Sequence, residues 1–434
     1  MRIPKRLLKR IAIGFGIILG LLLVVNGVLA WIARHRWDQM IAGLRADGEP
    51  TSLADLAPNP IPPEKNAYVY LQQIEAPLEK LFCRDQAEFY VYGLGRQIDA
   101  RTGYELPNKE QRIAMRAILD AYPTIMPAIA KATACDQYES LADFTLPASR
   151  FLDQSLNDAQ AFRRLMVGFA SWEMAVAAAE GKPNEAVGFG VQMLRLARLY
   201  DQRSTMMSHF VFVACSDSSL GAINEILRHH EIAPSVRADL DAELALHSAA
   251  PLLGFVRRER AFSISRAIEQ TTPIFVRWPI LNRMLDEIDA ESQVYSISKL
   301  PLDQLHPQWN PATKENLPPQ LGSISGRLIE RTLKTAITMD LRSLARDRCL
   351  RVVNALGEYR ARTGKEAESI EQLSLPREAI IDPCTGKPLR MTKTDAGWIV
   401  YSVYRNGDDD GGKFHAEDGP WGFGPPGYEN QHTK

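Results

Sequence analysis

The chain has 434 residues, of which 45% are hydrophobic and 24% are charged. This length suffices for two or three domains, and this composition excludes disorder over most of the chain. The formal net charge of −1 hides an asymmetry, because the first 36 residues hold seven Lys or Arg and no acid. Beyond residue 36 there are therefore 44 of the 51 basic residues and all 52 acidic residues. This net charge of −8 argues against nucleic acid as a partner and against attraction of the body to anionic lipid.

The N-terminal region contains an uncharged run of 23 residues from Ile11 to Ala33. A helix of this length, rising ~1.5 Å per residue, crosses the ~30 Å hydrocarbon core of a bilayer. Five cations precede the run and two follow it. The positive-inside rule therefore predicts a single-pass protein of the cytoplasmic (inner) membrane, with its N-terminus inside and its bulk exported. Residues 1–36 are expected to be the cytoplasmic tip and the transmembrane helix.

A cleaved signal peptide is the alternative, since Val28, Leu29 and Ala30 resemble a cleavage site. The apolar run before that site is longer than the ~7–15 residues of a usual signal peptide, so we favour an uncleaved anchor. Gly16 and Gly20 form a GxxxG pattern, through which two such helices would make a homodimer. Small residues are common in membrane helices, so a homodimer is not favoured.

The region after the anchor begins with a Pro-rich segment. Residues 37–63 are expected to be a semi-rigid spacer that stands the body off the membrane, because proline fixes φ and removes backbone donors. One helical turn is expected at residues 52–57. Trp31 and Trp37 are expected near the outer membrane interface, where an indole meets both lipid and water.

Residues 64–320 are expected to form an irregular helical bundle. Apolar residues at spacings of three and four between Phe162 and Val176 predict one helix, which Gly181 ends before a second helix starts. The two predict an antiparallel helical hairpin. Further helices are predicted over 205–229, 234–249, 252–270 and 280–300. In the third of these, Arg257, Arg258 and Arg260 are interpreted as a charged helix face.

The C-terminal domain, residues 321–434, combines a long helix with strands. Over residues 341–364 the apolar positions Cys349, Val352, Val353, Leu356 and Tyr359 lie on one side of a helix. The later segment WIVYSVY is rich in strand-forming residues, and turn residues precede it. The expected fold class is therefore mainly α: an irregular helical bundle with an N-terminal transmembrane helix and a small α+β C-terminal domain.

This C-terminal order resembles the globular domain of the major pseudopilins of type II secretion, and related domains of bacterial envelope proteins. The resemblance rests on Tyr359, Asp382-Pro383, Gly386-Lys387-Pro388-Leu389, Tyr401-Ser402-Val403, Asn406-Gly407 and Gly411-Gly412. It implies a helix packed on a small antiparallel sheet, with calcium at the last loop. The glutamate that follows the prepilin cleavage site of a pseudopilin is missing after Gly14-Phe15, which argues against filament assembly.

The last loop is the one candidate metal site. Its proposed ligands are Asn406, Asp408, Asp410, Glu417 and Asp418, which offer the hard oxygen atoms that Ca²⁺ prefers. The spacing is not that of an EF-hand, and a solvated acidic turn is the alternative. Structural Ca²⁺ is thus the only cofactor that the sequence suggests.

The resemblance also implies a disulfide between Cys349 and Cys384. In the resembled domain, an aromatic residue at the position of Cys384 lies near the helix that here carries Cys349. Exported proteins maintain such bonds, whereas cytosolic ones rarely do.

The chain contains no HExxH or CxxC motif and no complete set of catalytic motifs. The leading hypothesis is therefore a non-enzymatic, membrane-anchored envelope scaffold or interaction protein, with an unknown protein partner. The alternatives are a membrane-tethered hydrolase with an unrecognised site in the bundle and an accessory component of a secretion system. A pocket in the bundle with two inward-facing titratable groups of perturbed pKa would favour the hydrolase.

Overall fold

The computed structural model describes residues 5–84, 106–140, 142–201, 205–249, 254–269, 277–298, 324–395, 397–403, 409, 411–413 and 421–425. The helical elements up to residue 201 are α1 (Lys5–Ala46), η1 (Ala54–Leu56), η2 (Pro63–Lys65), α2 (Ala67–Gln72), α3 (Glu75–Arg84), α5 (Lys109–Asp120), α6 (Ile125–Thr133), α7 (Ala148–Arg163), η3 (Arg164–Ala170), α8 (Ser171–Ala179) and α9 (Pro183–Asp201). The later helical elements are α10 (Met206–His229), α11 (Pro234–Ser248), α12 (Val256–Glu269), α13 (Arg277–Ser298), α15 (Ile324–Thr363), η4 (Ile370–Leu373) and α16 (Arg377–Ile380). One sheet follows, made of β1 (Arg390–Thr394), β2 (Gly397–Ser402) and β3 (Trp421–Phe423). The described chain is therefore mainly helical with a small antiparallel sheet, as the sequence predicts.

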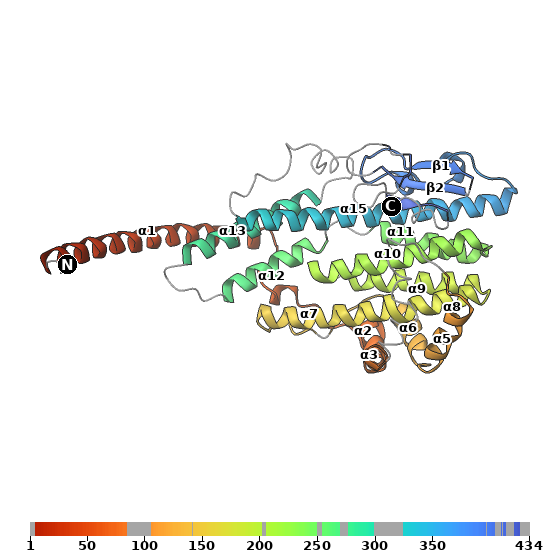
Figure 1. Ribbon diagram of the computed structural model, residues 1–434, viewed down its shortest axis with the longest axis horizontal. Coiled ribbons are helices and arrows are strands. Elements are labelled where there is room, and N and C mark those ends of the chain that lie inside the picture. The colour runs from red at the N-terminus through yellow and green to blue at the C-terminus, as the bar shows by residue number, and fades with distance from the viewer. Residues whose placement is uncertain are drawn as a thin grey trace.

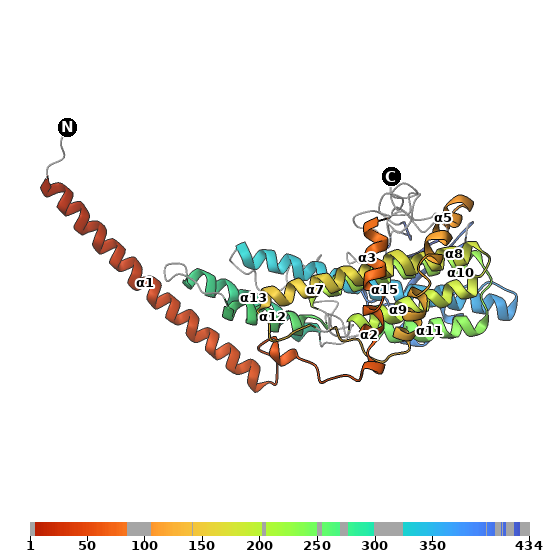
Figure 2. The ribbon, with the colours of Figure 1, turned by 90° about the horizontal axis from the view of Figure 1, so that it is seen from below.

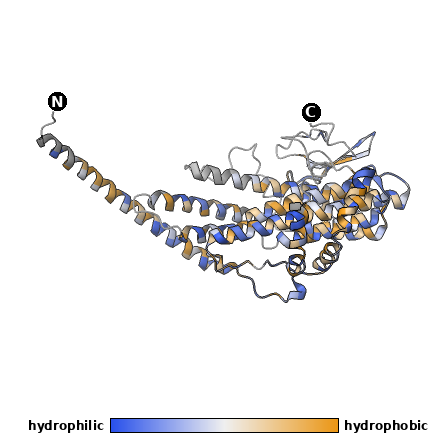
Figure 3. Cartoon of the chain, turned by 60° about the horizontal axis from the view of Figure 1, so that its bottom comes forward, coloured by the Kyte–Doolittle hydropathy of each residue, from blue (hydrophilic) through white to orange (hydrophobic). Residues whose placement is uncertain are grey.

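Helix α1 extends from the body as a long rod (Figure 2). Between residues 13 and 32 it presents mainly apolar side chains to the surface, such as Phe15, Val24 and Trp31, which are 68%, 64% and 69% exposed. Figure 3 shows this apolar surface on the part of the helix remote from the body. An exposed apolar helix of this length is suited to span a membrane, which confirms the predicted N-terminal helix.

The second half of α1 packs directly on the body. Ala33, Trp37 and Ile41 are buried against an apolar surface formed by α12 and α13, which includes Ile264 and Leu285. Trp37, expected at the outer membrane interface, is only 5% exposed and belongs to this contact. The exposed apolar part and the docked part form one uninterrupted helix, so no break in regular structure lies between them.

The segment expected to hold the body away from the membrane lies along the body instead. Leu53 is buried, and its N–H donates to Ser265 Oγ on α12 at 2.8 Å. Glu49 Oε2 accepts from Arg260 Nη2 at 2.8 Å and from Arg257 Nε at 2.9 Å. The predicted charged helix face is corrected at Arg260, whose side chain is 3% exposed, while the side chain of Arg257 is 44% exposed and Arg258 donates to the carbonyl oxygen of Asp201. The predicted helical turn is present as η1.

The predicted helical hairpin is formed by α8 and α9, which pack closely on each other. Gly181, at φ +77°, ends α8, since its N–H and that of Lys182 donate to the carbonyl groups of Ala178 and Ala177. Pro183 then starts α9. The first helix of the hairpin is not uniform, because η3 is a π-helical stretch between α7 and α8. The hydroxyl of Ser171 donates to the carbonyl oxygens of Val167 and Gly168 in this stretch. A π-helical turn is wider than an α-helical one, which leaves these oxygens available.

Helix α10 lies at the centre of the bundle, between α9 and α15 (Figure 1). Its hydropathy would allow a second membrane span, but 67% of its most apolar window is buried inside the body. We therefore treat α10 as a core helix. Its observed bounds, Met206–His229, agree with the predicted helix over 205–229.

The C-terminal strands pack on α15 (Figure 1). The sheet is antiparallel in the order β1-β2-β3, with Met391 opposite Val400 and Val400 opposite Phe423. Alternation along β2 places Val400 in the main core together with Phe423. The predicted arrangement of a helix on a small antiparallel sheet is therefore present at this coarse level.

One hydrophobic core joins the two regions that the sequence suggested as separate domains. Cys349, Val352 and Leu356 of α15 belong to the same apolar cluster as residues of α9, α10 and the sheet. The proposed boundary between 320 and 321 lies outside the described residues. Because the core is shared, the C-terminal region described here has no separate apolar core large enough to stabilise it alone.

Asp382 fixes the turn that precedes β1. It is 1% exposed, and its Oδ1 accepts from Ser402 Oγ at 2.7 Å and from Cys384 N at 2.8 Å. Its Oδ2 accepts from Val403 N at 3.0 Å. Burial raises the pKa of Asp382, which these hydrogen bonds oppose. The buried carboxylate therefore connects the turn to the end of β2.

We expect Asp382→Ala to lower the free energy of unfolding by ~2–3 kcal/mol, because three buried donors lose their acceptor. Asp382→Asn should cost less, since the amide oxygen still accepts from two of them. Asp395→Ala, at an exposed acid in the turn between β1 and β2, is the control and should change stability by less than ~0.5 kcal/mol. Chemical denaturation of the solubilised full-length variants measures all three, and an Asp382→Ala value equal to the control would contradict this assignment.

Candidate functional site

The five proposed calcium ligands, Asn406, Asp408, Asp410, Glu417 and Asp418, all lie outside the described residues. Asp409, an acid of the same run that is described, accepts from the hydroxyl of Tyr401 at 2.7 Å and from Gly411 N at 3.0 Å. Among the described residues, no three His, Cys, Asp or Glu side chains are grouped as metal ligands. The calcium site stays a prediction.

Cys349 and Cys384 are both buried, and both are free thiols in this structure. The thiol of Cys349 is directed to the carbonyl oxygen of Trp421 in β3, at 3.8 Å, and not to Cys384. Burial raises the pKa of each thiol, so neither is readily ionised. The disulfide implied by the pseudopilin resemblance is therefore not formed here.

A buried histidine joins three helices. His209, on α10, contacts Asp201 at the end of α9 through Nδ1 at 2.7 Å, and Asp340 on α15 through Nε2. Its ring stacks on Phe255, with centroids 4.5 Å apart. Burial would lower the pKa of His209, but the carboxylates of Asp340 and Asp201 outweigh it and raise this pKa to about 10. The imidazolium therefore donates to both carboxylates at neutral pH.

A second buried histidine lies one helix away. His247, on α11, contacts Asp347 of α15 through Nδ1 at 3.1 Å, and its ring stacks on Phe212. Burial opposes the protonation of His247, whereas Asp347 raises its pKa above the ordinary value. Asp340 and Asp347 are seven residues apart and so lie on one face of α15. That face carries the carboxylates that hold α10 and α11.

Further ion pairs join α15 to its neighbours. Arg346 Nε lies 3.3 Å from Asp217 of α10, and Arg351 Nε lies 2.9 Å from Asp241 of α11. The guanidinium of Arg346 also lies over the ring of Phe423, 4.5 Å from its centre. Asp241 is partly exposed and the other groups are buried, and neither His209 nor His247 lines the cavities at Asp158 or the groove between α11 and α15. Their arrangement is suited to hold helices together, not to act on a substrate.

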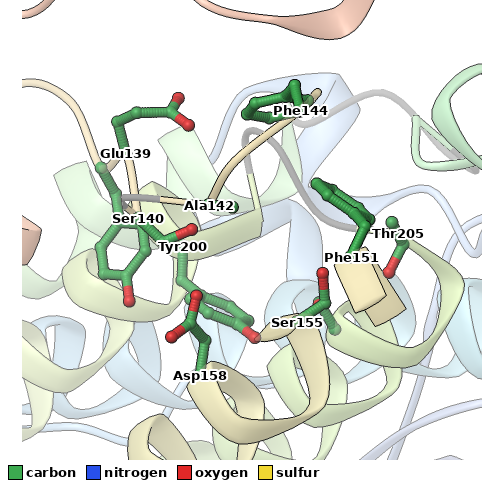
Figure 4. A pocket seen from close by; sticks show the side chains of 11 residues that line it. Glu139, Ser140, Ala142, Phe144, Phe151, Ser155, Asp158, Tyr200 and Thr205 are labelled. Carbon is green, nitrogen blue, oxygen red and sulfur yellow. The ribbon is translucent and has the colours of Figure 1, made fainter. Parts of the chain in front are cut away.

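A polar cavity of about 50 Å³ opens beside α7 and α9 (Figure 4). Its lining residues are Tyr138, Glu139, Ser140, Ala142, Phe144, Phe151, Ser155, Asp158, Tyr200, Thr205 and Ser208. Burial raises the pKa of Asp158 to about 6; the hydroxyl of Ser140 opposes this shift and the charge of Glu75 adds to it. Tyr138 and Tyr200 are buried as well, and burial raises the pKa of both. This cavity combines an acid of perturbed pKa with aromatic walls, and it is the strongest candidate site in the described residues.

Asp158 also borders a second, smaller cavity. This space, of about 20 Å³, lies toward Tyr68, Glu75 and Phe162 and shares Tyr138 and Asp158 with the first. Burial raises the pKa of Tyr68, and its hydrogen bond to Glu75 adds to the shift. The carboxylate of Asp158 therefore stands between two cavities.

A larger open groove lies elsewhere, between α11, α15 and residues 373–376, with a volume of about 440 Å³. Its charged lining is balanced: Arg237 and Arg362 face it together with Asp241 and Glu358. The groove therefore shows no charge preference for a ligand.

The buried histidines and Asp158 could not be predicted as site residues from the sequence, for different reasons. His209 directly precedes the apolar run FVFVAC, which is a local signal that its ring is buried. Asp158 lies among polar residues on the amphipathic helix α7, and its cavity is completed by Tyr138 and Tyr200 from distant segments. No local pattern marks it.

Searches with known protein families, curated proteins and solved structures found no match to this chain.

Proposed function

We propose that the protein is a non-enzymatic, membrane-anchored scaffold of the bacterial envelope, whose helical body makes protein contacts outside the bilayer. The observation that carries this proposal is α1, a single helix that is apolar and exposed in one half and docked on the body in the other. An anchor built in this way sets both the distance and the orientation of the body relative to the membrane. Such control is useful to a scaffold.

The body supports this proposal through its closed core. Large apolar side chains fill it, and its buried charges are paired across α9, α10, α11 and α15. A pseudopilin-like C-terminal region is part of the proposal, supported by the helix-on-sheet arrangement of α15 with β2 and β3. An accessory role in a secretion system would follow if the partner belonged to one.

The membrane-tethered hydrolase is the competing proposal, and the cavity at Asp158 bears on it. Asp158, Tyr138 and Tyr200 line this cavity and have raised pKa values, so the cavity meets the condition of two titratable groups that favours a hydrolase. However, substrate pockets usually measure ~300–1,000 Å³, several times this cavity. Its described lining also contains no histidine, cysteine or lysine to act with a serine as a nucleophile and base. We therefore favour the scaffold.

Affinity capture of the full-length chain from detergent-solubilised membranes tests the scaffold proposal. A partner protein should co-purify at a fixed ratio, whereas an unrelated single-pass protein with the same tag should not capture it. Absence of any enriched protein, together with hydrolysis of ester or peptide substrates that Asp158→Asn abolishes, would establish the hydrolase instead.

Protease treatment of sealed membrane vesicles tests the orientation. In right-side-out vesicles, the body should be digested and a fragment that retains residues 1–33 should stay with the membrane. Digestion of the body only in inverted vesicles would reverse the proposed orientation. A mature chain that begins at Trp31 would instead identify residues 1–30 as a signal peptide.

We also retain calcium as a proposed structural ion of the last loop. Carboxylates in a short loop repel one another, and a divalent cation removes that repulsion. Calcium should raise the free energy of unfolding by RT ln(1 + [L]/Kd), ~2.7 kcal/mol at a hundredfold excess over Kd. Thermal unfolding of the full chain measures this with calcium and with chelator, because the shared core makes an isolated C-terminal fragment unsuitable. An unchanged midpoint across millimolar calcium would mean that the loop is only a solvated acidic turn.

A further inference from the structure

We propose that the cavity bordered by Tyr138, Asp158, Tyr200 and Thr205 binds a primary ammonium group that enters from solvent. The proposal concerns a site that the scaffold function does not require. It rests on the charge of the lining, its aromatic walls, its hydroxyl groups and its size.

The charged side chains among the described lining residues are acids. Asp158 and Glu139 border the cavity, and Glu75 lies beyond Asp158 in the adjoining space. No lysine, arginine or histidine occurs among the described residues that line either cavity. A carboxylate removed from water without a cation is unfavourable, which the raised pKa of Asp158 reflects. A bound cation would remove this cost.

The walls are aromatic. The rings of Tyr138 and Tyr200 meet edge to face with centroids 5.2 Å apart, and those of Phe144 and Phe151 lie 5.1 Å apart. Each ring face carries a negative quadrupole that attracts a cation within ~6 Å of its centre. These walls favour a cation with an alkyl substituent over a fully hydrated metal ion.

Two hydroxyl groups in the lining have no hydrogen-bond partner. Tyr200 Oη and Thr205 Oγ1 are buried, and the residues are 5% and 8% exposed. Ser208 lies close to Tyr200 Oη without making an aligned hydrogen bond. Figure 4 shows the carboxylate of Asp158 and the hydroxyl of Tyr200 directed toward the same space. These two groups offer oxygen acceptors for N–H donors of a primary ammonium group, and Thr205 adds a further hydroxyl to the lining.

The size of the cavity selects among cations. A space of about 50 Å³ admits a compact ammonium group on a thin alkyl chain. A quaternary ammonium is bulkier and lacks N–H donors, so it would leave both hydroxyl groups unpaired. The chemistry is therefore that of a lysine side chain or of a free polyamine.

Thermal unfolding of the detergent-solubilised full-length protein tests the proposal, with methylammonium chloride as the probe. Phosphate buffer is required, because Tris is itself a primary amine. Methylammonium should raise the midpoint in a saturable way with a Kd in the ~millimolar range, as a probe of two heavy atoms allows. Sodium chloride and tetramethylammonium chloride at equal ionic strength should produce no saturable rise.

The variants separate binding at this cavity from a general salt effect. Asp158→Asn is nearly isosteric and should weaken methylammonium binding more than tenfold, and Thr205→Val should weaken it several-fold. Asp153→Asn, at an exposed acid on the same helix, is the matched control and should bind as the wild type does. Equal shifts with tetramethylammonium, full binding by Asp158→Asn, or no shift at 100 mM methylammonium would each overturn the proposal.

Two larger probes then identify the source of the ammonium group. Acetyl-lysine methylamide, with its free side-chain amine, represents a protein partner, and spermidine represents a free polyamine. The probe that binds more tightly than methylammonium and competes with it identifies the source of the ammonium group. Failure of both to compete would exclude the cavity as a site for a natural amine. These outcomes are independent of the capture experiment on the scaffold.

Discussion

Replacing His209 by leucine is expected to lower the free energy of unfolding by ~3–5 kcal/mol. The imidazolium contacts Asp201 and Asp340, which belong to α9 and α15, and all three side chains are largely removed from water. Leucine would fill part of the volume but would leave two carboxylates close together without the imidazolium between them. A carboxylate buried without a partner is far costlier than a lost contact between neutral groups.

His229→Leu is the matched control for this substitution. His229 is on the same helix α10, but its side chain is 45% exposed and pairs with Glu225 at 3.5 Å. An exposed pair contributes little, so we expect a change below ~0.5 kcal/mol. Urea denaturation of both variants, followed by far-UV circular dichroism, gives the comparison. Equal destabilisation by the two substitutions would mean that His209 does not hold the helices together.

The same contact makes stability depend on pH in a defined window. The pKa of His209 rises from an ordinary value near 6.5 to about 10 in the folded protein. The stability gained from the charged form is therefore complete below pH 6.5 and is lost as pH rises toward 10. The difference in unfolding free energy between wild type and His209→Leu should shrink steadily from pH 6.5 to 9.5. A difference independent of pH over this range would show that His209 is neutral in the fold.

The helices of the bundle were predictable because their signals are local. Pro234 begins α11 and the apolar stripe of α10 ends at its last turn, so predicted and observed bounds agree within one residue. Gly181 and Pro183 likewise define the turn of the α8–α9 hairpin. Each of these helix ends is determined by residues that are close together in the sequence.

The buried charges were not predictable, since their partners are distant in the sequence. In α15 the run RSLARDRCLR has the composition of a solvated helix surface, yet Arg346, Asp347 and Arg351 are buried. Each is paired with a side chain of α10 or α11 that lies 100 or more residues earlier. A single sequence contains no local signal for such a pair. The Asp158 cavity was missed for the same reason.

The docking of α1 on the body was also missed, and it leads to the second large effect that we expect. The spacer was predicted over residues 37–63, but residues 37–46 belong to α1, and only residues 47–63 contain little regular helix. The composition does not predict where the segment lies, because its position depends on contacts of Glu49 and Leu53 with α12. Ala33, Trp37 and Ile41 follow the uncharged run of α1 at helical spacing. Nothing in the sequence therefore distinguishes the surface that contacts α12 and α13 from the apolar helix before it.

Trp37→Ala is expected to destabilise the contact of α1 with α12 and α13 by ~3–5 kcal/mol, because it removes a buried indole and leaves a void beside Ile264, Leu285 and Ile288. Trp31→Ala is the control on the same helix. Trp31 is 69% exposed and stacks only on His35, so its loss should have little effect in detergent.

Hydrogen exchange of the full-length protein in detergent micelles measures this contact directly. The amides of α12, α13 and the end of α1 should exchange faster in Trp37→Ala, while α9 and α10, whose core is separate from this cluster, should keep their protection. If Trp37→Ala exchanged like Trp31→Ala, α1 would not be held on the body, and residues 47–63 would act as a flexible tether. If the contact holds as the structure shows it, a force or a partner that tilts the body must also tilt the helix in the bilayer, because one continuous helix carries both surfaces.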